Sequence, residues 1–521
     1  MDIDALVVGA GPTGLTLGCE LARRGVRVRV VDAAAGPFTG SRGKGLQPRT
    51  LEVLDLLGVG RRLLGLGRFR LPMRVPDGAG GFEVRDLHPD AAPTPSSPYA
   101  RPLIIPQFRV EETLRDALAG HGVQVEFGRR LTGLAQGDGS ATATFDDGTR
   151  ITARWVVGCD GGSSTVRHLG GFTFLGQTDE TIRMLIADVR VEGVDRDHWH
   201  AWGGAEGAFI ALCPLASTDR FQFQASTAAD DHREPTREVV QELLDRATGG
   251  QVQVVDVGWS SRWRLNERMV DRYRAGRVLL AGDAAHVHSP AGGQGMNTGI
   301  QDAANLGWKL AAVAAGADPA LLDTYEAERL PVAAEVLGLS ARLTRRTLLD
   351  RGEDGTRALQ LGLTYRGGPL APDGGATAAG PRPGDRAPDA TELLCGEPGA
   401  RPVRLFDLLR GSTWTLLGFG AMPPEVGIGV RRVGIAGPGG AAGVVDTQGH
   451  AHDAYRPVDG ELVLVRPDGH IGLRTTDPDA VRAYLSAVLP PDEALTSARS
   501  TATRSSTSPT PVIGAPVSVL R

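Results

Sequence analysis

The feature that most constrains this chain is a glycine-rich turn within its first fifteen residues. An apolar run at residues 5–8 leads into the sequence GAGPTG at residues 9–14, and a helical pattern follows. A second strand is predicted at residues 26–31, with Asp32 at its end. In such a strand, turn, helix and strand unit the glycines let the backbone approach a pyrophosphate, and the acid accepts hydrogen bonds from a ribose. The sequence therefore predicts an α/β domain that binds FAD or NAD.

Length, charge and cysteine usage exclude several other classes of protein. The chain has 521 residues, which suggests about three domains. Its net charge is only -5, and it has no long run of Lys or Arg, so we expect neither a nucleic-acid partner nor a membrane surface. The start of the chain lacks the pattern of a secretory signal, and no apolar stretch approaches the roughly 18 residues of a membrane span. We therefore expect a cytoplasmic protein. The four cysteines make no metal-ligand spacing and are expected to be buried, inert thiols.

Hydrophobic periodicity divides the chain further. Alternating patterns at 184–191, 207–213 and 221–225 predict a mainly antiparallel sheet inserted into the nucleotide-binding domain. Apolar periodicity then predicts helices at 297–315 and across most of 321–347. Past a Gly, Pro and Ala-rich linker, strands are expected at 413–419, 430–436 and 462–466, and a helix is expected at 478–488.

Two later segments resemble motifs of a known family. The first is GCDGGSSTVR at residues 158–167, and the second is GDAAHVHSPAGGQGMN at residues 282–297. Together with the first glycine turn they are similar to the aromatic-hydroxylase group, class A, of single-component FAD-dependent monooxygenases. That group includes polyketide-tailoring and phenol hydroxylases with a thioredoxin-like C-terminal domain. The resemblance covers nearly the whole chain, and it favours FAD as the bound nucleotide.

The resemblance implies roles for particular residues. Asp160 serves FAD and the nicotinamide together, Asp283 bonds the ribityl chain, and residues 290–297 run beside the isoalloxazine. A helix starting near Gly295 would then direct its N-terminal dipole at the flavin edge where negative charge collects. The expected cofactor-binding residues are Gly9, Gly11, Pro12, Thr13, Gly14, Asp32, Arg42, Gln107, Asp160, Asp283, Pro290, Gly293, Gly295, Met296 and Asn297.

The resemblance, together with periodicity and composition, gives the expected fold and domain boundaries. The fold is α/β: a Rossmann-like FAD-binding domain, an inserted mainly antiparallel β-sheet domain and a small thioredoxin-like domain. The boundaries are the FAD-binding domain at 1–172 and, with a long helix, at 276–366; the substrate-binding sheet at 173–275; a linker at 367–388; the thioredoxin-like domain at 389–495; and a flexible tail at 496–521. The third domain contains VRPDGHI at 465–471, for which we expect a role in packing or dimer support.

The substrate is expected between the inserted sheet and the flavin. The residues proposed to line or orient it are His200, Trp202, Phe209, Phe221, Gln222 and Phe223, with Trp199 and Gln224 as further candidates. Core packing is the alternative for the aromatic residues, and a solvated or satisfied role is the alternative for the others. His286 and His288 are expected to orient the backbone. No general base, and no other catalytic residue, is identified.

The predicted activity follows from the family. We expect a monooxygenase that uses FAD, NADPH or NADH, and O2 to hydroxylate an aromatic or polyketide-type small molecule through a flavin C4a-hydroperoxide. High Gly, Ala and Arg usage suggests a GC-rich bacterial source and antibiotic tailoring. Baeyer-Villiger insertion into a polycyclic ketone, a non-catalytic flavin- or ligand-binding protein, and a flavin-dependent dehydrogenase or reductase remain open alternatives. A monomer or a homodimer is expected.

Overall fold

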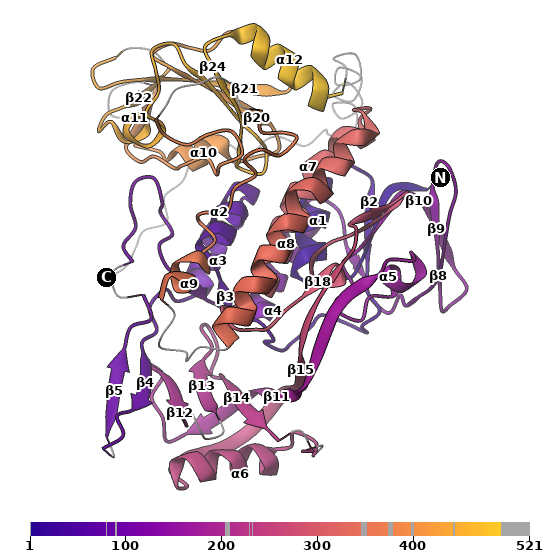
Figure 1. The fold of residues 1–521 in the computed structure, drawn as a ribbon, viewed down its shortest axis with the longest axis vertical. Helices are drawn as coiled ribbons and strands as arrows, with labels where there is room; N and C mark the ends of the chain where they lie inside the picture. Colours follow the sequence, from indigo (N-terminus) through magenta and orange to yellow (C-terminus); the bar gives the residue numbers. More distant parts are fainter. Residues whose placement is uncertain are drawn as a thin grey trace.

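A computed structural model describes residues 2–79, 81–88, 91–203, 209–228, 230–231, 233–344, 352–372, 379–396, 401–440 and 443–490. Within these ranges the strands form two eight-stranded sheets, a six-stranded sheet and a two-stranded pair. Figure 1 shows the six-stranded sheet at one end, the inserted sheet with helix α6 at the other, and the long helices α7 and α8 between them. The expected tail lies outside the described residues.

The first sheet brings the three predicted motifs to one edge. Its path is β16 (Arg274–Ala275), β17 (Val278–Leu280), β10 (Arg150–Gly158), β1 (Ile3–Val8), β2 (Val28–Val31) and β7 (Val125–Glu126), with β8 (Leu131–Gln136) and β9 (Ala141–Phe145) added beside β10. The four strands β17, β10, β1 and β2 are parallel, and Gly158 pairs with both Val8 and Leu280. Parallel strands in this register end together, so the segments that follow them are neighbours.

Two helices pack closely because small residues face each other. Helix α1 (Pro12–Ala22) lies against α7 (Gly295–Ala314), and a Cβ on Gly299 would overlap the Thr13 hydroxyl. The helix expected at 297–315 is therefore confirmed. The other helices of this half are α2 (Pro48–Leu57), α3 (Gly60–Leu66), α4 (Gln107–Gly120), α5 (Thr165–Leu169), α8 (Asp323–Thr344) and α9 (Gly352–Arg357), with short 3-10 turns at Gly282–Ala284 and Pro319–Leu322.

The inserted sheet is larger than the segment 173–275 from which it was expected. Its order is β18 (His286–Val287), β15 (Gln253–Val270), β11 (Phe174–Glu192), β14 (Phe221–Thr227), β13 (Ile210–Pro214), β12 (Trp199–Trp202), β4 (Met73–Pro76) and β5 (Phe82–Arg85). The pairing is antiparallel except between β12 and β4. Strands β4 and β5, which come from the first segment of the FAD-binding domain, thus extend this sheet, and β4 pairs with the edge that β12 would otherwise leave open. Helix α6 (Arg237–Thr248) covers one face.

The C-terminal domain matches its expected elements closely. The sheet order is β19 (Leu393–Cys395), β22 (Val444–Asp446), β21 (Val430–Ala436), β20 (Trp414–Phe419), β23 (Leu462–Val465) and β24 (Ile471–Thr475), with helices α10 (Leu405–Leu409), α11 (His450–Tyr455) and α12 (Pro478–Val488). Trp414 packs edge-on against Trp308 of α7, with ring centroids 5.3 Å apart. The core of this domain is therefore continuous with the core of the first sheet.

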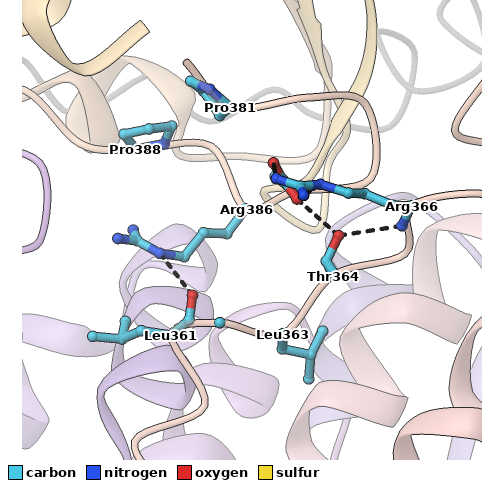
Figure 2. Close-up of a pocket in the computed structure, with 9 residues that line it drawn as sticks. Leu361, Leu363, Thr364, Arg366, Pro381, Arg386 and Pro388 are labelled. Carbon is cyan, nitrogen blue, oxygen red and sulfur yellow. Dashed lines mark hydrogen bonds and ion pairs between the residues drawn. The ribbon is translucent and has the colours of Figure 1, made fainter. Parts of the chain in front are cut away.

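The described part of the linker is packed against the protein. Asp385 accepts hydrogen bonds from Thr364 and Arg366, and Arg386 donates to the Leu361 carbonyl and to Glu52 of α2. Residues from 361–366 and from 381–388 line a recess of about 300 Å³, shown in Figure 2. The remaining linker residues, 373–378, lie outside the described ranges. The short pair β3 (Gly45–Leu46) and β6 (Leu103–Ile104) completes the fold. Among the described residues, no helix is both long and apolar enough to cross a bilayer.

Candidate functional site

Two glycines of the first turn are required by close packing, and the third lies beside an open space. Gly9 has a φ of 107°, and a Cβ there would overlap the Cys159 carbonyl oxygen. A Cβ on Gly14 would overlap the Gly9 carbonyl oxygen. Gly11, in contrast, would meet nothing within 4 Å, and it precedes α1, whose N-terminus has no side-chain cap. The middle glycine therefore leaves room beside free N–H groups, as a pyrophosphate requires.

Asp32 lies beside this turn, as the ribose-binding role requires. Its Oδ2 accepts a hydrogen bond from the Ala10 amide at 2.7 Å, and its Oδ1 accepts one from the Ala34 amide at 2.8 Å. The two bonds fix the carboxylate at the end of β2. Each oxygen keeps a further lone pair for a hydroxyl donor.

Asp160 is bound mainly by the protein itself. Its carboxylate accepts hydrogen bonds from the Ser164 hydroxyl and from the amides of Thr165 and Val166, at the start of α5. Burial raises the pKa of Asp160, although these donors oppose the shift. The buried Arg167 then joins this segment to the next motif by donating to the Ala284 carbonyl at 2.9 Å. Asp160 therefore holds the turn in shape.

Asp283 follows β17 at the same edge of the sheet. Its side chain is exposed, yet the protein around it raises its pKa by burial, while His286 and Arg42 act in the opposite direction. A Cβ on Gly295 would lie 3.7 Å from Asp283 Oδ1. The carboxylate is thus reachable by a ligand and lies next to the first residue of α7.

The loop before α7 is held by Asn297. The Asn297 amide accepts a hydrogen bond from the Gln47 amide at 2.7 Å and donates to the carbonyls of Gly45 and Gly293 at 3.0 and 2.7 Å. The side chain therefore reaches back to the loop before α7 and ties that loop to β3. Helix α7 starts at Gly295, as expected, and no side chain caps it.

The Arg42 segment, Gln107 and Met296 meet at one point. Gln107 Oε1 accepts a hydrogen bond from the Gly43 amide at 3.0 Å, and a Cβ on Gly43 would lie 3.4 Å from Met296 Cε. Arg42 is exposed and lies over the Phe38 ring. The sequence did not point to Glu111, which is buried and accepts from Gln107 Nε2 at 2.8 Å. Burial raises the pKa of Glu111 to about 7.

The two histidines of the second motif have different partners. His286 Nε2 lies 2.7 Å from Asp302 Oδ2, which also accepts from the Gly282 amide. His286 thus orients a buried carboxylate, whereas a backbone role was expected. His288 Nδ1 lies 2.9 Å from the Ser289 carbonyl, and burial lowers the pKa of His288 to about 4. His288 is therefore neutral at neutral pH.

Several residues expected near the substrate belong to a core. Trp202, Phe221 and Phe223 pack with residues of α6 such as Val240 on one side of the inserted sheet. His200 is buried, stacks on Trp202 at 5.8 Å and lies with Nε2 2.9 Å from the Asp195 carbonyl. Trp202, Phe221 and Phe223 are therefore core residues, and His200 is a buried residue with a backbone partner, as the alternative to substrate binding proposed.

The other side of the sheet faces the Arg42 segment. Gln222 alternates with Phe221 and Phe223, so its Nε2 reaches the Ser41 carbonyl. Lys44 Nζ donates to Gln222 Oε1 at 2.7 Å and lies 4.2 Å from the centre of the Trp199 ring, and Gln224 Nε2 donates to the same oxygen. Phe209 joins Trp199 in a smaller cluster around Met73.

Asp188 is a residue of this face that sequence reasoning missed. Its side chain is 2% exposed, and neither carboxylate oxygen makes a hydrogen bond of good geometry to any described residue. Burial raises the pKa of Asp188 to about 7, although Ser41, Arg220 and Lys44 oppose the shift. The only sequence signal was an acid inside an apolar strand, LIADV at residues 185–189.

The assembled edge fits FAD. It joins an open glycine turn, two helix N-termini without side-chain caps, the carboxylates of Asp32 and Asp283, and the cationic Arg42. Helix N-termini suit the pyrophosphate and the electron-rich edge of a flavin, and carboxylates suit hydroxyl groups.

Comparisons with known proteins agree with this geometry. The model of a family described as an FAD binding domain matches residues 2–340. The chain is 43% identical to a flavin-dependent monooxygenase of Mycobacteroides abscessus, over 93% of this chain and 99% of the relative. It is 37% identical to the 12-dehydrotetracycline 5-monooxygenase/anhydrotetracycline 6-monooxygenase of Streptomyces rimosus, over 90% and 95% of the two chains.

Solved structures of the same kind share the fold. Anhydrotetracycline hydroxylase from Streptomyces rimosus superposes with a TM-score of 0.74 at 32% identity, over 94% of this chain and 100% of that one. Aklavinone-11 hydroxylase, solved in a ternary complex with FAD and aklavinone, gives a TM-score of 0.77 at 28% identity, over 94% and 99%.

Proposed function

This chain belongs to the FAD-binding-domain family that includes flavin-dependent monooxygenases, and we propose that it hydroxylates a planar, polycyclic aromatic molecule of the polyketide type. It is an enzyme that uses FAD, a reduced nicotinamide and O2. The relatives that act on anhydrotetracycline and aklavinone support this substrate class, because each of these names denotes a fused-ring compound. The work of the protein itself is to bind, to orient and to exclude water.

The observation that carries the proposal is the polar face of the inserted sheet. Gln222, Lys44 and Trp199 lie together on the side of the sheet that faces the Arg42 segment. A flat indole suits a planar ring system, and an ammonium group beside a phenol favours its phenolate form. A phenolate is richer in electrons at its ring carbons, which is the property that oxygen transfer to a ring requires. We assign substrate binding to this sheet, including β4 and β5.

FAD, when bound, would supply the redox chemistry by which one oxygen atom of O2 reaches the substrate. The N-terminal N–H groups of α7 would stabilise negative charge on the reduced flavin. Asp283 and Asp32 would accept hydrogen bonds from hydroxyl groups of the cofactor, and Arg42 would supply a positive charge beside it. Asp188 holds a proton on its carboxyl near neutral pH, because burial raises its pKa.

The first test is a spectrum and a turnover assay. The purified protein should show the two visible flavin bands. It should oxidise NADPH or NADH faster when fused-ring phenols or quinones are added, and release a product with one additional hydroxyl group. Protein that binds no added FAD would contradict the assignment. Oxygen inserted beside a ketone would instead identify a Baeyer-Villiger enzyme. Both products gain one oxygen, so the product structure has to be solved.

Lys44 provides the sharper test of the substrate class. With a phenolic substrate, we expect Lys44→Met to lower kcat/KM about tenfold at pH 7, a loss of about 1.4 kcal/mol, and less at pH 9, where the free phenol ionises by itself. Gln253→Leu, on an exposed position of β15, is the control and should change neither value. An equal loss at both pH values would contradict a role in phenolate binding.

We also propose that the enzyme acts in the cytoplasm, where reduced nicotinamide is available, as a monomer or a homodimer. The small net charge supports the absence of a nucleic-acid partner. Size-exclusion chromatography with light scattering would give the oligomeric state.

A further inference from the structure

We propose that the loop Arg466–His470 of the C-terminal domain is a positioning device for the FAD site, which fixes α7 and the Gly282–Asp283 turn through two buried chains of contacts. The proposal rests on the FAD site described above. It gives a function to a domain that was expected only to pack or to support a dimer. The residues concerned are positioning residues, because they act on the cofactor through other groups.

The loop joins β23 to β24 and is inserted into the FAD-binding domain. Arg466, Asp468 and His470 are 2%, 5% and 3% exposed. Gly469 has a φ of 76°, and a Cβ there would lie 2.6 Å from Leu56 of α2. Arg49 of α2 donates to the Asp468 carbonyl at 3.0 Å. The loop therefore sits against α2 with three ionisable side chains out of water.

The first chain of contacts holds the distal half of α7. Arg466 donates two hydrogen bonds to Glu328 of α8, at 2.6 and 2.8 Å, and two to Asp468, at 2.6 and 3.2 Å. Lys309 of α7 donates to the same Glu328 at 2.7 Å, and Trp308 Nε1 donates to Asp468 at 3.1 Å. Two cations and two carboxylates thus balance one another in a buried cluster. They join α7, α8 and the loop.

The second chain reaches the cofactor segments. The His470 ring lies on the Tyr365 ring, with centroids 4.3 Å apart, and the Tyr365 hydroxyl accepts from Arg329 at 3.0 Å. Arg329 donates to Asp302 at 2.7 Å and to the Thr298 carbonyl, in the first turn of α7, at 3.2 Å. Asp302 in turn accepts from the Gly282 amide, next to Asp283, at 3.1 Å.

The ionisation of Asp302 supports the second chain of contacts. Burial by itself would raise the pKa of Asp302, but Arg329 and His286 outweigh burial and lower it. The carboxylate therefore stays ionised and keeps its bond to the Gly282 amide. The two chains hold α7 at Thr298, in its first turn, and again at Trp308 and Lys309, about 16 Å along its axis.

The buried cluster of Arg466, Lys309, Glu328 and Asp468 fixes the positions of its members more closely than stability requires. A buried ion-pair cluster gains little over apolar side chains of similar size, but it accepts only one arrangement of its members. Clamping α7 at two levels, with one branch ending at Gly282, sets the position of both segments that face the cofactor. Folding alone would not require these contacts to end at Gly282.

The test compares two buried arginines of the same domain. Arg466 and Arg474 are each 2% exposed, and each donates two hydrogen bonds to one carboxylate. Arg466 binds Asp468 of its own loop and Glu328 on α8, whereas the carboxylate partner of Arg474 is Glu461 inside the C-terminal domain. Arg466→Met and Arg474→Met therefore remove the same kind of contact, but only the first removes the link to the FAD-binding domain.

We expect Arg466→Met to raise the dissociation constant of FAD about tenfold and to speed amide hydrogen exchange at residues 282–300. Arg474→Met should leave both within about twofold of the wild type, at a similar loss of melting temperature. Equal effects of both variants, or no effect of Arg466→Met on FAD binding and exchange, would show that the loop serves folding alone.

If Arg466→Met does not fold, Tyr365→Phe tests the same proposal. This change retains the ring beside His470 and removes only the hydroxyl that accepts from Arg329. We expect about threefold weaker FAD binding and faster exchange at residues 282–300, with little change in melting temperature. Unchanged binding and exchange would overturn the proposal. Wild-type protein that binds no FAD would instead contradict the proposed function, and the exchange measurement would still test the coupling.

Discussion

Gly11 and Gly14 differ in what surrounds them, although the GxGxxG pattern treats them alike. A Cβ on Gly14 would overlap the Gly9 carbonyl, whereas a Cβ on Gly11 would meet nothing within 4 Å. The protein backbone itself therefore requires a glycine at position 14, whereas the space beside Gly11 is open to a ligand. This difference lets single substitutions separate the fold from the cofactor.

We expect Gly11→Ala to weaken FAD binding with little loss of melting temperature, because the new methyl group takes up space beside α1 that the cofactor needs. Gly14→Ala should lower both FAD affinity and melting temperature, because the backbone itself has to move. Titration of the apoprotein with FAD and thermal unfolding without FAD measure the two effects. A loss of stability in Gly11→Ala as large as in Gly14→Ala would contradict this interpretation.

Asp188 makes the second residue-scale prediction. Its pKa is about 7 in the folded protein, against about 3.9 in an unfolded chain, so the folded state holds the proton more tightly. Stability therefore falls as pH rises from about 4 to 7 and then levels off. We expect Asp188→Asn to remove this loss and to be the more stable protein at pH 8, by up to about 4 kcal/mol.

Denaturant unfolding of Asp188→Asn and of wild type at pH 5 and pH 8 measures this difference. Asp256→Asn is the control, because that carboxylate is half-buried on the same sheet and forms ion pairs with Arg190 and Arg220. Its loss should destabilise the protein slightly at both pH values. A stability gap between Asp188→Asn and wild type that does not change with pH would show that Asp188 is ionised throughout.

At the scale of elements, the loop before α7 depends on Asn297. Asn297→Ala leaves the Gln47 amide and the carbonyls of Gly45 and Gly293 without this partner. We expect a loss of about 1–3 kcal/mol in unfolding free energy and about tenfold weaker FAD binding, since the loop carries the start of α7. Asn266→Ala, on β15, should leave FAD binding unchanged. Normal FAD affinity in Asn297→Ala would mean that the loop keeps its position without this side chain.

The elements also show where periodicity was sufficient. The helix expected at 478–488 and the strand expected at 430–436 have these bounds in the structure. The helix buries Val481, Leu485 and Val488 at helical spacing, and the strand ends in a run of four buried residues. Of the strand expected at 207–213, residues 207 and 208 lie outside the described ranges, and the described part is a strand over Ile210–Pro214. The helix expected to begin at Leu321 begins at Asp323, after a 3-10 turn that opens on Pro319.

At the scale of the whole molecule, the domains share one core. Trp414, Leu464 and Leu485 of the C-terminal domain belong to the same buried cluster as Leu310 of α7. The buried ion pair of Arg466 and Glu328 crosses the same boundary. Domains joined by a continuous apolar core and buried charges unfold together.

We therefore expect a single cooperative transition in calorimetry of the full chain. Protein cut after residue 366 should aggregate or unfold at a lower temperature, because the cut exposes the apolar surface around Trp308. Two resolved transitions in the full chain, or a stable and soluble fragment 1–366, would contradict a shared core.

From the sequence alone, the glycine turn at residues 9–14 predicted a dinucleotide, and hydrophobic periodicity predicted most of the elements. The resemblance of residues 158–167 and 282–297 to motifs of a known flavoprotein family then selected FAD and the chemistry, and the parallel strands bring these segments to one sheet edge. The tertiary structure decided which face of each strand meets that site. Alternation separates Phe221 from Gln222, but it does not say which of the two faces α6.

Long-range pairing likewise lay beyond the sequence. No local pattern joins β4 to β12, buries Asp188 beside Ser41, or carries the loop Arg466–His470 to α7 and α8. Such contacts depend on how separate elements pack, because the environment of a buried charge is built from residues far apart in the chain. The sequence therefore predicts which groups the enzyme has, and the tertiary structure determines which of them act together.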